Sequence, residues 1–155
     1  MEIEGSKKFI SKLEKIETVC LDTSILIYHL EDIHPYNILT KILLEKIASG
    51  DIACNISTLT ITELLTKPYK MNNIKKVSIF EDFIQSLPNT KIADVSYNIA
   101  KNASRIRAAY NLRTPDAILL ATASLNKRSC FITNDISFKN INIKEITILV
   151  LNNYL

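Results

Sequence analysis

Four carboxylates stand where the sequence places strand ends or short helices: Asp22, Glu63, Asp116 and Asp135. Each has an ordinary structural explanation, as a strand-end cap, a first-turn acid favoured by the helix dipole or a solvated side chain. Gathered at one edge of a sheet, however, four carboxylates would repel one another unless a cation neutralised them. Oxygen ligands without His or Cys suit Mg²⁺ or Mn²⁺. Such an ion activates water and holds a phosphoryl oxygen, so the set predicts phosphodiester hydrolysis.

The elements that must position these acids are short apolar runs separated by helical segments. The runs predict five strands, at residues 18–21, 52–55, 91–93, 130–133 and 146–151. Strands that alternate with helices indicate right-handed crossovers, and therefore an α/β fold: a single domain of three layers, α/β/α, with a mainly parallel five-stranded sheet. Ligands of such sheets bind beyond the carboxyl ends of the strands, where Asp22 and Asp135 fall.

Helix boundaries follow from caps and prolines. Ser24 is expected to cap a helix that continues to residue 30, and Asp94 a helix that continues to residue 110. A helix that begins near residue 58 carries Glu63, and Pro68 is expected to end it.

An N-terminal extension precedes the main domain. Phe9, Leu13 and Ile16 have helical spacing, with lysines between them, so residues 1–17 are expected to form an amphipathic helix and residues 18–155 the domain. The apolar stripe has no evident partner in the sequence. It is therefore expected to form part of a homodimer interface or to cover the site in cis.

Composition excludes several classes of protein. A chain of 155 residues has room for one domain. Its two glycines exclude the glycine-rich dinucleotide and phosphate loops and the nucleophile elbow. Three widely spaced cysteines argue against a zinc site and fit a reducing cytoplasm. The longest late apolar run has six residues, where a membrane helix needs about 20.

Four short motifs together resemble those of the PIN-domain ribonucleases. They are Leu21-Asp22-Thr23-Ser24, Ile61-Thr62-Glu63-Leu64, Leu112-Arg113-Thr114-Pro115-Asp116-Ala117 and Ile132-Thr133-Asn134-Asp135 with Phe138. The resemblance covers residues 18–151 in the family's order. It implies that the four acids bind Mg²⁺ or Mn²⁺, with Ser24, Thr133 and Asn134 as supporting polar residues. Many bacterial and archaeal members are toxins of toxin–antitoxin pairs, which implies an RNA substrate and an antitoxin partner.

Basic residues adjoin two of the acids. Lys67 and Lys70 follow Glu63 with no acid nearby, and all four arginines flank Asp116. A nuclease needs cations for the phosphate backbone, so Arg113, Lys67 and Lys70 are the candidate RNA-binding residues.

Two other functions remain open. Phosphatases of the haloacid dehalogenase class use Asp-x-Asp after the first strand, but here the second acid is Ser24, and Glu63 would have no role. A non-catalytic scaffold that binds RNA without cutting it is the other alternative. Such a domain would normally have lost at least one acid, and all four are present.

Overall fold

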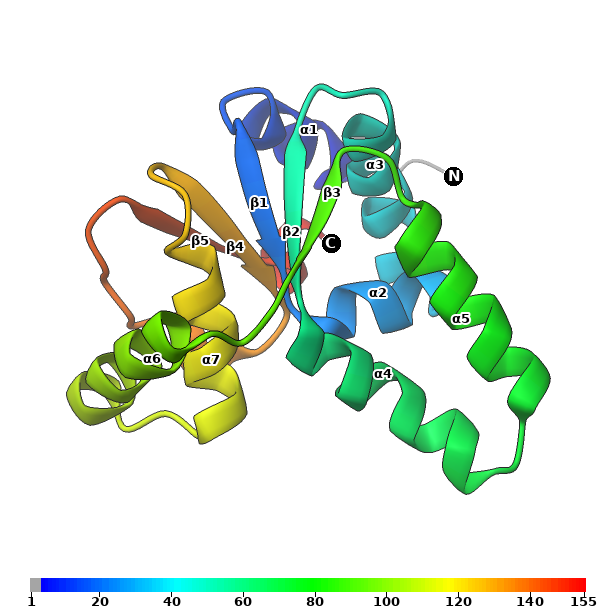
Figure 1. Cartoon of the computed structure of the whole chain (residues 1–155). Helices are drawn as coiled ribbons and strands as arrows, with labels where there is room; N and C mark the ends of the chain where they lie inside the picture. The colour runs from blue at the N-terminus through cyan, green and yellow to red at the C-terminus, as the bar shows by residue number, and fades with distance from the viewer. Residues whose placement is uncertain (1–3) are drawn as a thin grey trace.

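The computed structural model describes residues 4–155, which form a twisted sheet with helices on both faces (Figure 1). All neighbouring strands are parallel, in the order β3-β2-β1-β4-β5. The strands are β1 (Thr18–Leu21), β2 (Ala53–Ser57), β3 (Thr90–Ala93), β4 (Ser129–Thr133) and β5 (Ile146–Val150). The predicted α/β fold is confirmed, with a sheet that is parallel throughout.

Two helical layers enclose the sheet. One contains α2 (Thr23–Leu30), α3 (Tyr36–Ala48), α4 (Thr58–Lys70) and α5 (Ile74–Ser86), and the other α6 (Tyr97–Tyr110) and α7 (Thr114–Ala123). Consecutive residues of β1 serve opposite layers: Val19 and Leu21 pack with the first and Cys20 with the second. This explains why the strand is apolar at every position. No helix within residues 4–155 has the length and apolar character needed to cross a membrane.

The strand order reverses between β1 and β4. From β1 the chain builds outward through β2 to β3, then returns to place β4 on the other side of β1. Leu21 pairs with Ile132, and the Asp22 amide donates to the Ile132 carbonyl at 2.9 Å. The segments that follow β1 and β4 therefore lie side by side at the carboxyl edge, the usual ligand position in such sheets.

Three expected helix boundaries are wrong. Asp22, in extended conformation, is the N-cap of α2, so Ser24 lies inside the helix. Ser96, not Asp94, caps α6 by accepting from the Ile99 amide. Pro68 does not end α4, because its ring is buried and the helix loses only one late hydrogen bond; α4 continues to Lys70.

The N-terminal helix α1 (Ser6–Leu13) packs against the end of the chain. Phe9 and Leu13 are fully buried, and the Phe9 ring lies 5.2 Å from that of Tyr154 in the 3₁₀-helix η2 (Leu151–Tyr154). A side chain at Gly5 would collide with the Tyr154 carbonyl, so this close approach requires glycine. The apolar stripe is thus covered within the chain and is not open to a second copy; residues 1–3 of the expected extension lie outside the described residues.

Candidate active site

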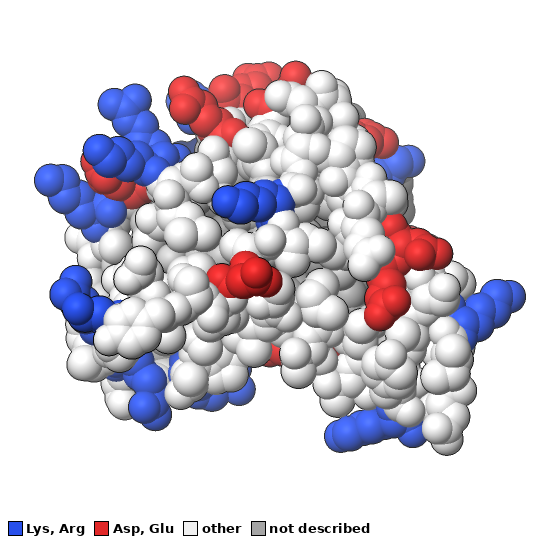
Figure 2. All heavy atoms as spheres, viewed as in Figure 1, with Lys and Arg blue, Asp and Glu red and all other residues white. Residues whose placement is uncertain are grey.

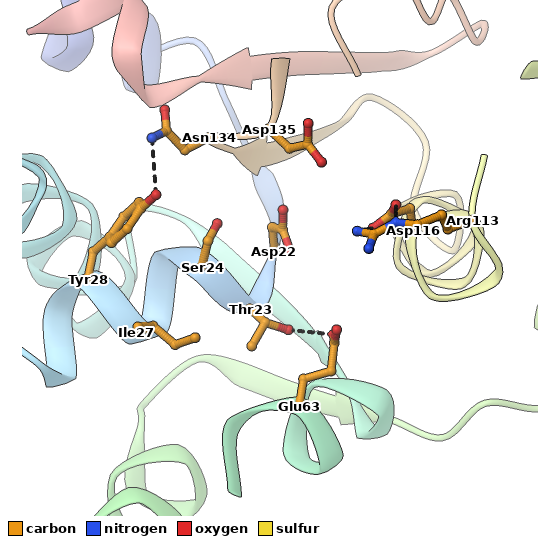
Figure 3. A pocket seen from close by; sticks show the side chains of 10 residues that line it. All are labelled: Asp22, Thr23, Ser24, Ile27, Tyr28, Glu63, Arg113, Asp116, Asn134 and Asp135. Carbon is orange, nitrogen blue, oxygen red and sulfur yellow. Dashed lines mark hydrogen bonds and ion pairs between the residues drawn. The ribbon is translucent and has the colours of Figure 1, made fainter. Parts of the chain in front are cut away.

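A pocket of about 410 Å³ opens at the carboxyl edge of the sheet, where the strand order reverses. All four predicted acids line it, and they come from four separate segments of the chain (Figure 3). The other lining residues are Thr23, Ser24, Ile27, Tyr28, Arg113 and Asn134. The fold thereby brings Asp22 to the same cavity as Asp116 and Asp135, which lie 94 or more positions later in the sequence.

Asp22 is a partly buried acid of this pocket. The residue directly follows β1, and its carboxylate accepts a hydrogen bond from Thr133 Oγ1 at 2.6 Å instead of capping α2. Burial raises the pKa of Asp22; the hydrogen bond from Thr133 lowers it, and the charges of Glu63 and Asp116 raise it further. The net shift is upward, so the folded protein holds this carboxylate as an anion at a cost.

Glu63 is positioned by the first turns of two helices. Ser57 caps α4 by accepting from the Leu59 amide, and Glu63 follows one turn later. Thr23 Oγ1, in the first turn of α2, donates to Glu63 Oε1 at 2.8 Å (Figure 3). The apolar residues of α4 pack against the core, and Glu63 therefore lies on the side of the helix that faces the pocket.

Asp116 lies in the first turn of α7, where the helix dipole favours an acid. Arg113 Nε donates to Asp116 Oδ2 at 2.9 Å, and a second guanidinium nitrogen lies 3.4 Å from Oδ1. The Asp116 side chain is 13% exposed and that of Arg113 is 78% exposed. The Asp116 carboxylate therefore lies inside the pocket, and the Arg113 guanidinium lies at its rim.

The segment after β4 supplies Asp135 and two polar residues. Asp135 Oδ1 accepts from the Ser137 amide at 2.8 Å and so caps the 3₁₀-helix η1 (Ile136–Phe138). Thr133 Oγ1 also accepts from the Asp135 amide, so one hydroxyl joins Asp22 to this turn. Asn134 donates to the Tyr28 hydroxyl and accepts from the Asn152 amide, and these bonds anchor the turn to α2 and η2.

The donor set fits a hard divalent cation. The four acids are supplemented by Ser24, whose buried hydroxyl oxygen has no hydrogen-bond partner among the described residues. As placed, no three His, Cys, Asp or Glu side chains of residues 4–155 are close enough to hold an ion together. All four acids already accept hydrogen bonds within the chain, from Thr133, Thr23, Arg113 and Ser137. Shared coordination, directly or through water, stays a prediction.

Two predicted basic residues lie outside this pocket, and sequence reasoning missed one polar residue inside it. Lys67 lines a neighbouring pocket together with Glu63, and Lys70 is exposed at the end of α4. Thr23 was missed as the hydroxyl that holds Glu63. Its place directly after Asp22, at a helix start, was the available signal.

Comparison with known proteins identifies the class. The PIN domain model matches residues 19–144, and the chain belongs to the PIN-domain family. A search of curated protein sequences gave no significant match. Membership in this family overturns the phosphatase alternative, in which Glu63 had no role.

Similar solved structures include VapC and FitB toxins of toxin–antitoxin complexes. A toxin–antitoxin complex from Klebsiella pneumoniae matches with 25% identity and a TM-score of 0.63, covering 86% of this chain and 97% of that one. DNA-bound VapBC from Salmonella typhimurium matches with 20% identity and a TM-score of 0.67, and the match covers 88% of this chain and 99% of that one. FitAcB from Neisseria gonorrhoeae matches with 20% identity and a TM-score of 0.64, and the match covers 86% of this chain and 97% of that one.

The raised pKa of Asp22 predicts how stability depends on pH. Because the pKa of Asp22 is higher in the folded than in the unfolded protein, ionising Asp22 lowers the free energy of unfolding. This loss of stability is absent below about pH 3.9 and grows as pH rises through the folded-state pKa. Without metal, Asp22→Asn should therefore raise the melting temperature at pH 7, and the difference from wild type should shrink as pH falls. Thermal unfolding in EDTA measures this, with Asp82→Asn, which changes an exposed acid of α5, as the control. A lower melting temperature for Asp22→Asn at pH 7 would contradict the assigned strain.

Proposed function

We propose that the protein is a metal-dependent endoribonuclease that hydrolyses RNA phosphodiester bonds in the cytoplasm. Asp22, Glu63, Asp116 and Asp135 hold Mg²⁺ or Mn²⁺. The observation that carries this proposal is that four acids from separate segments line one pocket of a PIN domain. When bound, the ion supplies an activated water and neutralises charge on the phosphate.

The chain's own residues orient the site and the substrate. Thr133 holds Asp22, and Thr23 holds Glu63, so both carboxylates keep their direction toward the pocket. Arg113 uses two of its nitrogens on Asp116 and is otherwise exposed at the rim. A guanidinium carries five N–H donors, so Arg113 can contact an RNA phosphate while it stays beside Asp116.

We further propose that the protein is the toxin of a toxin–antitoxin pair. Support comes from its similarity to chains crystallised in such complexes. A protein partner silences the activity by placing an arginine among the four acids, where charge-assisted hydrogen bonds compete with the metal. The anionic pocket at the sheet edge suits such an insertion.

Cleavage of RNA tests the nuclease. The wild-type protein should cut RNA with Mg²⁺ or Mn²⁺ and not with EDTA. Asp116→Asn should lower the rate by about two orders of magnitude, because the variant loses a proposed ligand of the ion whose charge would stabilise the transition state. The control Asp82→Asn, which removes an exposed acid of α5, should cut normally. Activity that persists in EDTA, or in folded Asp116→Asn, would contradict the proposal.

Expression in a host that lacks the proposed protein partner tests the toxin role. Wild-type protein should arrest growth of the host, and Asp22→Ala should relieve the arrest while it accumulates to the same level. Asp82→Ala, made in parallel, should arrest growth as wild type does. Harmless accumulation of protein that cuts RNA after purification would exclude the toxin role and leave an RNA-processing nuclease.

A further inference from the structure

A second pocket adjoins the acidic one and shares two of its walls, Ile27 and Glu63. It measures about 260 Å³ and lies between α2, α4 and α5. The remaining apolar lining is Ile33, Leu64, Pro68 and Phe80. Pockets for drug-sized ligands usually measure roughly 300 to 1,000 Å³, so this one suits a smaller flat group. A group seated here lies directly beside whatever occupies the acidic pocket.

A basic stripe leads outward from the shared wall. Glu63, Lys67 and Lys70 are spaced i, i+4 and i+7 on α4, so they lie on one exposed face of the helix. Lys67 lines the second pocket, and in the part of the chain that the structure describes neither lysine forms an ion pair. Figure 2 shows blue side chains protruding at the lower right, where Figure 1 places the α4–α5 turn. The stripe suits a polyanion that continues from the acidic pocket.

The second pocket also holds an oriented hydrogen-bond acceptor. Glu31, at the end of α2, binds Lys76 Nζ through both carboxylate oxygens, at 2.7 and 2.8 Å. Lys76 in turn lies over the Phe80 ring, 5.5 Å from its centroid. Each carboxylate oxygen has a second lone pair, so Glu31 can still accept from a ligand. Carboxylates read the exocyclic amino group of cytosine in this way.

We propose that this pocket binds the nucleobase of the nucleotide next to the cut bond. Lys67 and Lys70 hold the neighbouring phosphates, and Glu31 favours bases with an exocyclic amino group over uracil. The inference rests on the proposed ribonuclease function. A base can enter only when it is unstacked, so the substrate is single-stranded at this position.

Binding of short labelled oligocytidylate and oligouridylate tests the base preference. The measurement uses fluorescence anisotropy with Asp116→Asn in Mg²⁺, so that the RNA is not cut. The cytidylate should bind on the order of tenfold more tightly, the discrimination expected from one base contact of this kind. Adding Glu31→Gln should largely remove the preference. Adding Glu14→Gln, which changes an exposed acid beyond α1, should leave it intact.

The phosphate contact has a different signature. Adding Lys67→Gln should lower the affinity for both oligonucleotides by the same factor. It should also reduce the slope of log affinity against log salt concentration by about 0.7 to 1. Lys12→Gln, which changes an exposed lysine of α1, is the matched control and should change neither the affinity nor the salt dependence.

Equal binding of the two oligonucleotides, or a preference unchanged by Glu31→Gln, would overturn the subsite. If wild-type protein nevertheless cuts RNA, the nuclease stands and the apolar pocket is left to a segment of a protein partner. If base preference is found but no RNA is cut, the nuclease fails and the subsite remains as an RNA-binding site.

Discussion

Carboxylates from four segments face one pocket, and the fold leaves them little freedom to move apart. The parallel pairing of β1 with β4 fixes Asp22 beside the turn that carries Asp135. Glu63 and Asp116 are held by helices whose other faces are buried in the core. Burial, and after it repulsion from Glu63 and Asp116, raises the pKa of Asp22, and the two apolar clusters that flank the sheet must outweigh the cost of this charge. The topology of the fold thus holds like charges close together at a cost in stability.

Local partners make this strain tolerable without a cation. The first turns of α2 and α7 lie at the pocket, and a helix N-terminus carries partial positive charge. Hydroxyls from Thr23 and Thr133 solvate two of the carboxylates, and Arg113 neutralises a third. These interactions also orient the oxygens that would bind a metal. The same contacts that let the free protein fold therefore prepare the site for a cation.

Much of the fold and site could be predicted because the signals are local. Apolar runs marked the strands, and Asp22 and Asp135 fell at their ends. Contacts between distant residues could not be predicted. Phe9 packs on Tyr154, so the stripe of α1 has a partner that its spacing in the sequence does not indicate. Pro68 does not end α4 as predicted, because burial of its ring outweighs one lost hydrogen bond. The Glu31–Lys76 pair joins α2 to α5, and nothing in the spacing of these two residues indicates it.

The acidic pocket is proposed to bind a divalent cation, and every other role assigned to the site depends on that ion. Titration calorimetry of Mn²⁺ into metal-free protein measures this directly. Wild type should bind saturably, and the affinity should fall as pH is lowered toward the raised pKa of Asp22, because protons then compete with the ion for this carboxylate. Asp22→Asn should bind on the order of tenfold or more weakly, and Asp82→Asn should bind as wild type does. No saturable binding to wild type, or equal binding to Asp22→Asn, would contradict the account.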